Sequence, residues 1–258
     1  MSAQQLPEKQ LASMLGRLQA NGAYSDLKIV CGSDTYLVHK AIVCPQSDFF
    51  RAACRPDTFA EGKTGVVNIP ASSGRADAFY DQPFNAEDFD WDLDVETTES
   101  VKFMIHYFYH HDYLEREMAE IEGSVLHSDK CRKGILAEHS RMYAMGERYG
   151  VPGLKALAIA NFQKSFIALN HAGLAAGIII AHKSTPEADK ALRSQIWFLL
   201  DIYIYHYMED QEIQQIISSI PGLAYALYRE RLKHRTWARS CAEDLQEGWQ
   251  KGFDDGER

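Results

Sequence analysis

The sequence lacks the short motifs that mark most enzyme active sites. It contains no glycine-rich phosphate loop, no GxSxG nucleophile elbow and no HExxH zinc motif. Self-similarity at the period of solenoids or propellers is also missing. We therefore predict no catalytic residue, no cofactor site and no metal site, and we expect that the chain is not an enzyme.

Cysteines and long apolar runs are also scarce. The five cysteines are an odd number and form no CxxC pair, which does not suit a disulfide framework, so we interpret them as reduced thiols. The first ten residues contain no apolar core of a signal peptide. The two most apolar runs, 173–181 and 196–207, are too short to span a membrane or are interrupted by Asp201. These absences predict a protein of the cytoplasm and/or nucleus without a membrane association.

The chain has fewer basic than acidic residues, 27 Lys and Arg against 36 Asp and Glu. The formal net charge of its 258 residues is −9, with 46% hydrophobic and 24% charged residues. This composition is that of a globular protein, and the negative charge repels nucleic-acid phosphates and anionic lipids. Proteins are therefore the expected partners, and no nucleic-acid binding is expected.

The N-terminal part carries mixed helix and strand signals. Residues 9–20 place Leu11, Met14, Leu15 and Leu18 at helical spacing. Alternating apolar residues over 27–31 and 35–38, joined by a polar turn, predict a β-hairpin. Ser47 is suited to cap a short helix, and the β-branched residues of 66–69 predict another strand. The pattern indicates an α+β fold with a small sheet.

An acidic segment interrupts this part over residues 71–95. It carries apolar side chains among its acids, and no Lys or Arg stands between Asp77 and Glu99. Two interpretations stay open: a solvated loop that binds nothing, or a short motif that folds onto a partner's basic-rimmed groove. Thr97 then caps a predicted helix whose buried face contains Val101, Met104, Ile105 and Phe108.

Helical patterns dominate the C-terminal half. We predict a linker over 119–134 and an all-α region over 135–240. Gly150 is expected to end its first helix, and Pro152 suits the first turn of the next. Further helices are predicted at about 153–168, 171–183, 186–208, 210–220 and 222–240, with boundaries good to about 2–4 residues.

Several segments together resemble a BTB/POZ domain. They are SDLKIVCG at 25–32, VHKA at 38–41, SDFF at 47–50, FAE at 59–61, VNIP at 67–70 and FMIHYFYHHDY at 103–113. The resemblance implies a BTB/POZ core over 8–118, with the acidic segment as an insertion. The stretch YAMGERYGVPGLKALAIANF at 143–162 is similar to the helical tail of fungal-type members, which implies a BACK-like or 3-box-like extension.

The resemblance also implies partner-binding residues. In the family, a hydrophobic-x-Glu motif at the position of Phe59 and Glu61 contacts cullin-3. The alternative for this chain is that Phe59 packs onto the protein's own core. Asp26 and Lys40 match an acid and a base that meet beside the dimer interface, the alternative being an ordinary ion pair. His39 matches a structural histidine. We expect Leu11, Met14, Leu15 and Leu18 to form the rest of a homodimer interface, since so short an apolar stripe is marginal in water unless it packs on something.

Three hypotheses for function follow. The preferred one is a non-catalytic scaffold that self-associates and acts as a cullin-3 ubiquitin-ligase substrate adaptor. The second is a transcription-linked oligomerisation scaffold. The third is a metal-dependent enzyme that uses His106 and His110, one helical turn apart. Its further ligands would come from His111, His127, Cys131 or His139.

Overall fold

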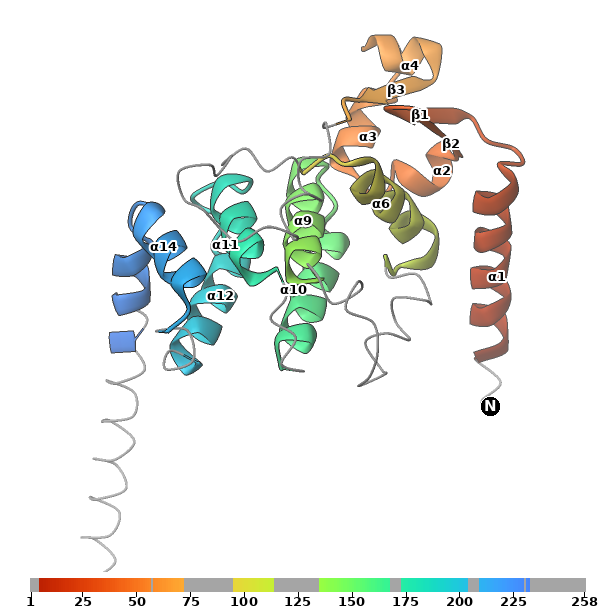
Figure 1. Ribbon diagram of the computed structural model, residues 1–258. Helices are drawn as coiled ribbons and strands as arrows, with labels where there is room; N and C mark the ends of the chain where they lie inside the picture. The colour runs from red at the N-terminus through yellow and green to blue at the C-terminus, as the bar shows by residue number, and fades with distance from the viewer. Residues whose placement is uncertain are drawn as a thin grey trace, which may run out of the picture. The chain divides into compact units, whose positions relative to one another are not determined.

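Helices and one small sheet make up the computed structural model of this chain (Figure 1), which describes residues 5–56, 58–71, 95–113, 135–167, 173–203, 209–229 and 231–232. The predicted α+β class is confirmed. The chain divides into two compact units, 1–192 and 193–258. Most of the acidic insertion (72–94) and the predicted linker 119–134 lie outside the described residues. The domain limits 8–118 and 135–240 stay predictions.

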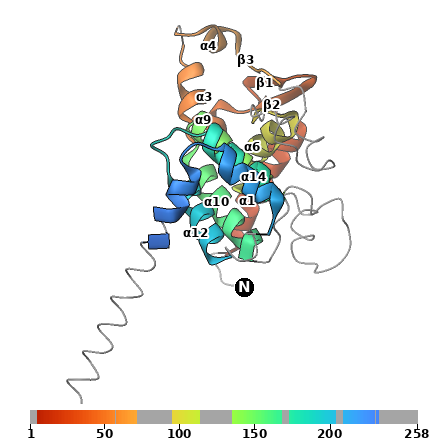
Figure 2. The ribbon, with the colours of Figure 1, turned by 60° about the vertical axis from the view of Figure 1, so that its left-hand side comes forward.

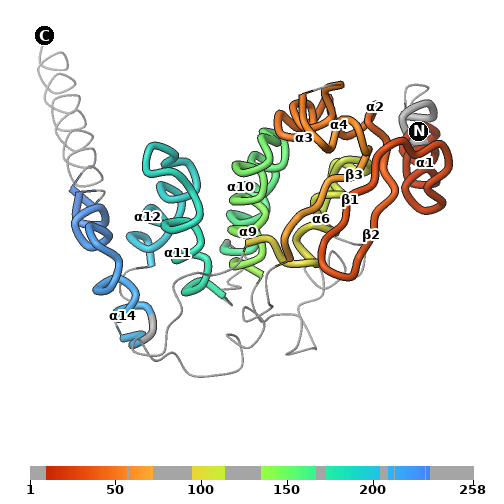
Figure 3. Tube along the Cα trace, turned by 90° about the horizontal axis from the view of Figure 1, so that it is seen from above, coloured from red at the N-terminus to blue at the C-terminus, as the bar shows by residue number. Residues whose placement is uncertain are grey.

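The sheet has three strands in the order β2-β1-β3 (Figure 3). Strands β1 (Leu27–Cys31) and β2 (Asp34–Val38) form the predicted antiparallel hairpin, and β3 (Val66–Ile69) runs parallel to β1. Alternate residues of β1 are fully buried, which is what a sheet with one face on the core requires. The hairpin prediction is therefore confirmed in both pairing and burial.

Five helices lie in the described residues of the N-terminal part. They are α1 (Gln5–Asn21), α2 (Lys40–Val43), α3 (Asp48–Ala53), α4 (Ala60–Thr64) and α6 (Thr98–His110). The two predicted caps are confirmed: Ser47 Oγ accepts from the Phe50 amide at 3.2 Å, and Thr97 Oγ1 accepts from the Ser100 amide at 3.0 Å. The predicted face of α6 is buried, and α6 packs on both α1 and α9.

Three further helices of the first unit lie among the described residues. Helix α9 (Ile135–Arg148) packs against α10 (Pro152–Ile167) and α11 (Leu174–Lys183), and α9 and α10 run side by side in Figures 1 and 2. As predicted, α9 ends before Gly150 and α10 begins at Pro152.

Helix α12 (Ala191–Ile202) begins later than the predicted residue 186. The reason is local: the Asp189 amide donates to the Pro186 carbonyl, and Asp189 Oδ1 accepts from the Ala191 amide at 3.3 Å, so residues 186–190 form a turn. Helix α14 (Gln211–Ser219) belongs to the second unit.

A polar clamp joins α3 to the end of α9. Ser47 Oγ donates to the Tyr149 carbonyl oxygen at 2.6 Å, and the Asp48 amide donates to the Gly150 carbonyl at 3.1 Å. The Phe50 ring stacks on the Tyr149 ring with 5.8 Å between centroids. Because these residues are about a hundred positions apart, the N-terminal part and α9 form one packed body.

The start of α10 lies directly on α6. A Cβ atom built on Gly153 would overlap the hydroxyl oxygen of Tyr107, whose side chain is buried. Only a residue without a side chain permits this approach, so Gly153 sets the distance between the two helices.

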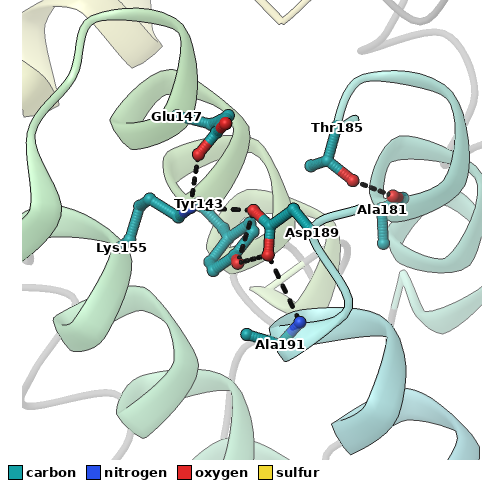
Figure 4. A network of polar contacts seen from close by, with 7 residues as sticks. All are labelled: Tyr143, Glu147, Lys155, Ala181, Thr185, Asp189 and Ala191. Atoms are coloured by element: carbon teal, nitrogen blue, oxygen red, sulfur yellow. Dashed lines mark hydrogen bonds and ion pairs between the residues drawn. The ribbon is translucent and has the colours of Figure 1, made fainter. Parts of the chain in front are cut away.

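A charged network holds the turn 184–190 against α9 and α10 (Figure 4). Asp189 accepts from the Tyr143 hydroxyl at 2.6 Å and from Lys155 Nζ at 2.8 Å, and Lys155 also pairs with Glu147. Burial raises the pKa of Tyr143 to about 12. Burial also works against the charged carboxylate of Asp189, but the hydrogen bonds from Lys155 and Tyr143 outweigh it and lower the Asp189 pKa. The network is therefore charged at neutral pH and stabilises the turn.

Candidate functional site

The exposed aromatic residue Phe59 stands at the start of α4. It is the N-cap residue of a short helix. Two local features favour that helix: Glu61 lies in its first turn, where a negative charge suits the helix dipole, and Gly65 ends it in a left-handed conformation. The Phe59 side chain is 51% exposed, so it is not part of the buried core.

The backbone beneath Phe59 is held firmly. A Cβ on Gly62 would overlap the Arg55 carbonyl oxygen, which shows how closely α4 lies on the end of α3. At its other end, the Gly65 carbonyl accepts from the Lys28 amide of β1 at 2.9 Å. An aromatic side chain on a fixed backbone loses little conformational entropy when it enters a partner's pocket. Glu61 is half-buried on the same short helix.

Helix α1 exposes part of its apolar stripe. Leu11 and Met14 are 54% and 45% exposed, whereas Leu15 and Leu18 are half-buried. The helix is attached to α6, where Gln19 Oε1 lies 2.8 Å from His110 Nε2. The outer part of the stripe is therefore open to a partner, and the inner part lies towards the chain's own surface.

Asp26 and Lys40 meet, though not as a pair of charged side chains. Asp26 Oδ1 accepts from the backbone amide of Lys40 at 2.7 Å. That amide is the first of α2, whose N-cap residue His39 supplies no side-chain cap. Asp26 therefore caps α2 from the neighbouring segment, a role that sequence spacing did not indicate.

His39 is a structural residue, as predicted. It is buried, with Nδ1 2.7 Å from the Tyr109 hydroxyl and Nε2 2.7 Å from the Ala23 carbonyl oxygen. The Tyr109 hydroxyl also accepts from the His39 amide at 3.1 Å. Nε2 must then donate to the carbonyl while Nδ1 accepts from Tyr109. Both ring nitrogens are used, so the side chain fixes the turn between the hairpin and α2.

The geometry of His106 and His110 does not suit a shared metal ion. Their rings stack with centroids 4.0 Å apart at an interplanar angle of 15°, rather than converging on one point, and burial lowers the pKa of His110. His139 is buried elsewhere, between the Tyr113 hydroxyl and Ser165 Oγ. In the part of the chain that the structure describes, no three His, Cys, Asp or Glu side chains are grouped as metal ligands. His127 and Cys131 lie outside that part.

The sequence did not indicate the residues that join the N-terminal part to helix α9. Tyr149 takes part in the clamp with Ser47 and also donates from its hydroxyl to Glu96 at 2.8 Å. Its place beside Gly150 was the only signal, and it indicated a helix end rather than a contact.

None of the helices among the described residues has the length and apolar character that a bilayer span requires.

Comparison with known proteins identifies the N-terminal part. No curated protein matches this chain. The model of one protein family does match, over residues 15–81, a range that contains the sheet and α2 to α4. The matching family is the BTB/POZ domain, which agrees with the buried His39, the Ser47 cap and the mixed three-stranded sheet. Residues 15–81 of this chain are therefore a BTB/POZ domain, a domain whose work is to bind other proteins.

Proposed function

We propose that this chain is a scaffold of the cytoplasm and/or nucleus that self-associates and links a target protein to cullin-3 as a ubiquitin-ligase adaptor. The observation that carries the proposal is the exposed Phe59 on the anchored start of α4. In the resemblance described above, this position belongs to the cullin-binding motif, with Glu61 as the polar partner.

The chemistry of the surface suits such an interface. Large aromatic side chains that fill a partner's pocket are typical interface anchors, and truncation of one costs about 2–4 kcal/mol of binding free energy. Each 1.4 kcal/mol is a factor of about ten in affinity. Phe59→Ala should therefore weaken cullin-3 binding roughly 30-fold to several hundred-fold.

The test is calorimetric titration of the purified chain with the N-terminal region of cullin-3. Tyr228→Ala is a matched control, because Tyr228 is a comparably exposed aromatic residue of the second unit. Since Phe59 is half exposed, Phe59→Ala should change the free energy of unfolding by no more than about 1 kcal/mol. Absence of binding by the unmodified chain at micromolar concentration, or equal binding by Phe59→Ala, would refute the adaptor role.

Glu61→Ala should have a smaller effect than Phe59→Ala. A charge at the rim of an interface acts mainly on the association rate and its salt dependence. Stopped-flow association at two salt concentrations measures this difference, and a loss of affinity as large as that of Phe59→Ala would contradict the assignment of Phe59 as the anchor.

Self-association is proposed through the exposed part of α1. Leu11 and Met14 project apolar surface that a second copy of the chain would cover, with Asp26 and Lys40 beside that interface. Light scattering at tens of micromolar should give a mass above the 29.2 kDa of one chain.

The double variant Leu11→Glu/Met14→Glu should bring that mass down to one chain, because charges at both positions would be buried without partners. Its far-ultraviolet circular dichroism serves as the control for folding. A single-chain mass for the unmodified protein would exclude this part of the proposal and leave the cullin test unaffected.

A further inference from the structure

Two cysteines converge on one backbone carbonyl in the BTB/POZ domain. Cys44 is the C-cap residue of α2, and its Sγ donates to the Phe50 carbonyl oxygen at 3.6 Å. Cys54 is the C-cap residue of α3, and its backbone amide donates to the same oxygen at 2.9 Å. Both cysteines are half-buried and unbridged. The ends of two helices thus bring the two cysteine residues to one carbonyl oxygen.

The two side chains also interact with each other. Burial and a hydrogen bond with the Cys54 side chain raise the pKa of Cys44 to about 12. Cys31, by contrast, is fully buried in β1, where a thiol is shielded from reagents. Among the described cysteines, only Cys44 and Cys54 combine contact with a second thiol and access to solvent.

We propose that Cys44 and Cys54 form a reversible disulfide bond when the protein meets a hydroperoxide. The Cys54 thiolate attacks the peroxide, the O–O bond breaks, and a sulfenic acid forms on Cys54 while one water is released. Cys44 Sγ then attacks the Cys54 sulfur, the S–S bond forms, and a second water leaves with the Cys44 proton. In total, two thiols and one hydrogen peroxide give one disulfide and two waters.

The order of attack follows from the surroundings. A thiolate is the nucleophile, and burial and the neighbouring Cys54 raise the pKa of Cys44, which disfavours Cys44 as the attacking group. Cys54 is therefore the residue that attacks the peroxide, and Cys44 is the resolving thiol. The bond would tie the ends of α2 and α3 together next to Arg55, whose carbonyl lies against Gly62 of α4.

Peptide mapping of the full-length chain tests the proposal. The reduced protein is treated with a few equivalents of hydrogen peroxide, its remaining thiols are alkylated after denaturation, and it is digested with trypsin without reductant. Cys44 and Cys54 fall in the separate peptides 41–51 and 52–63, because Arg55 is followed by Pro56. We expect a linked pair of these peptides, lighter than their sum by two hydrogens, that separates on addition of dithiothreitol. The peptide with Cys31 should stay alkylated.

Two single variants test the order of attack. In Cys44→Ser no resolving thiol is present, so the sulfenic acid of Cys54 should accumulate, where dimedone labels it, before it is oxidised further to the sulfinic acid. In Cys54→Ser, Cys44 should remain a thiol under the same treatment. The proposal is overturned if the unchanged protein gives no linked pair, if Cys54 is linked mainly to another cysteine, or if it is oxidised past the sulfenic acid without a link. The unchanged protein decides this even if a variant fails to fold.

Discussion

Ser47 should contribute about twice as much stability as an ordinary helix cap. Its hydroxyl accepts from the Phe50 amide and donates to the Tyr149 carbonyl, and its side chain is fully buried. The Ser47→Ala substitution removes both hydrogen bonds without adding bulk.

The magnitude follows from these two contacts. Loss of a Ser cap costs about 1 kcal/mol, and loss of a buried neutral hydrogen bond costs about 1 kcal/mol more. The Tyr149 carbonyl keeps a second donor, the Phe49 amide at 3.3 Å, so the larger penalty of an unpaired buried oxygen does not apply. We expect a total loss of about 2 kcal/mol, or a fall in Tm of about 4–8 °C for a unit of this size.

Urea denaturation followed by circular dichroism measures this loss, and Thr97→Ala is the matched control. Thr97 caps α6 in the same way, through the Ser100 amide, and among the described residues it has no contact with a distant carbonyl, although its hydroxyl also lies 2.8 Å from Ser100 Oγ. Measured in a Ser100→Ala background, which lacks that second contact, Thr97→Ala should therefore cost only about 1 kcal/mol. If the two variants lose the same stability, the clamp between α3 and α9 contributes nothing and the reasoning is refuted.

Two further predictions concern the packing of α6. Gly153→Ala should destabilise the protein by about 1–3 kcal/mol, because its Cβ would overlap the Tyr107 hydroxyl oxygen. In a Tyr107→Phe background the next nearest atom, Cζ, lies 3.5 Å from that Cβ, so Gly153→Ala should there be neutral or stabilising by up to about 1 kcal/mol. Urea denaturation measures both effects, and an equal loss of stability in the two backgrounds would contradict this explanation. Acid should weaken the contact between α1 and α6, because burial lowers the pKa of His110 below its usual 6.5, against the opposing charge of Asp112. The folded state then prefers the neutral ring. The contribution of His110 to the free energy of unfolding is therefore fully present above pH 6.5 and is lost as the pH falls below that value. The change in Tm from pH 7.5 to 5.5 should be smaller for His110→Gln than for the unmodified chain, and identical changes would exclude the mechanism.

The local elements of this protein are determined by its sequence alone. The hairpin over 27–38, the caps at Ser47 and Thr97 and the helix end near Gly150 were all predicted and are all present. Each depends on side-chain periodicity or on hydrogen bonds between residues at most four apart, so the information lies within a short window of sequence.

The tertiary structure decided which side chains meet and which stay exposed. The family resemblance implied that the side chains of Asp26 and Lys40 meet, whereas packing places the Asp26 carboxylate on a backbone amide of α2. The partners of Ser47 and Tyr143, at Tyr149 and Asp189, lie 102 and 46 residues away along the chain. The exposure of Phe59 was equally open in the sequence, because an aromatic residue outside a helical stripe can be buried or displayed. Contacts over such separations arise only when packed elements bring distant segments together, and no local pattern encodes that geometry.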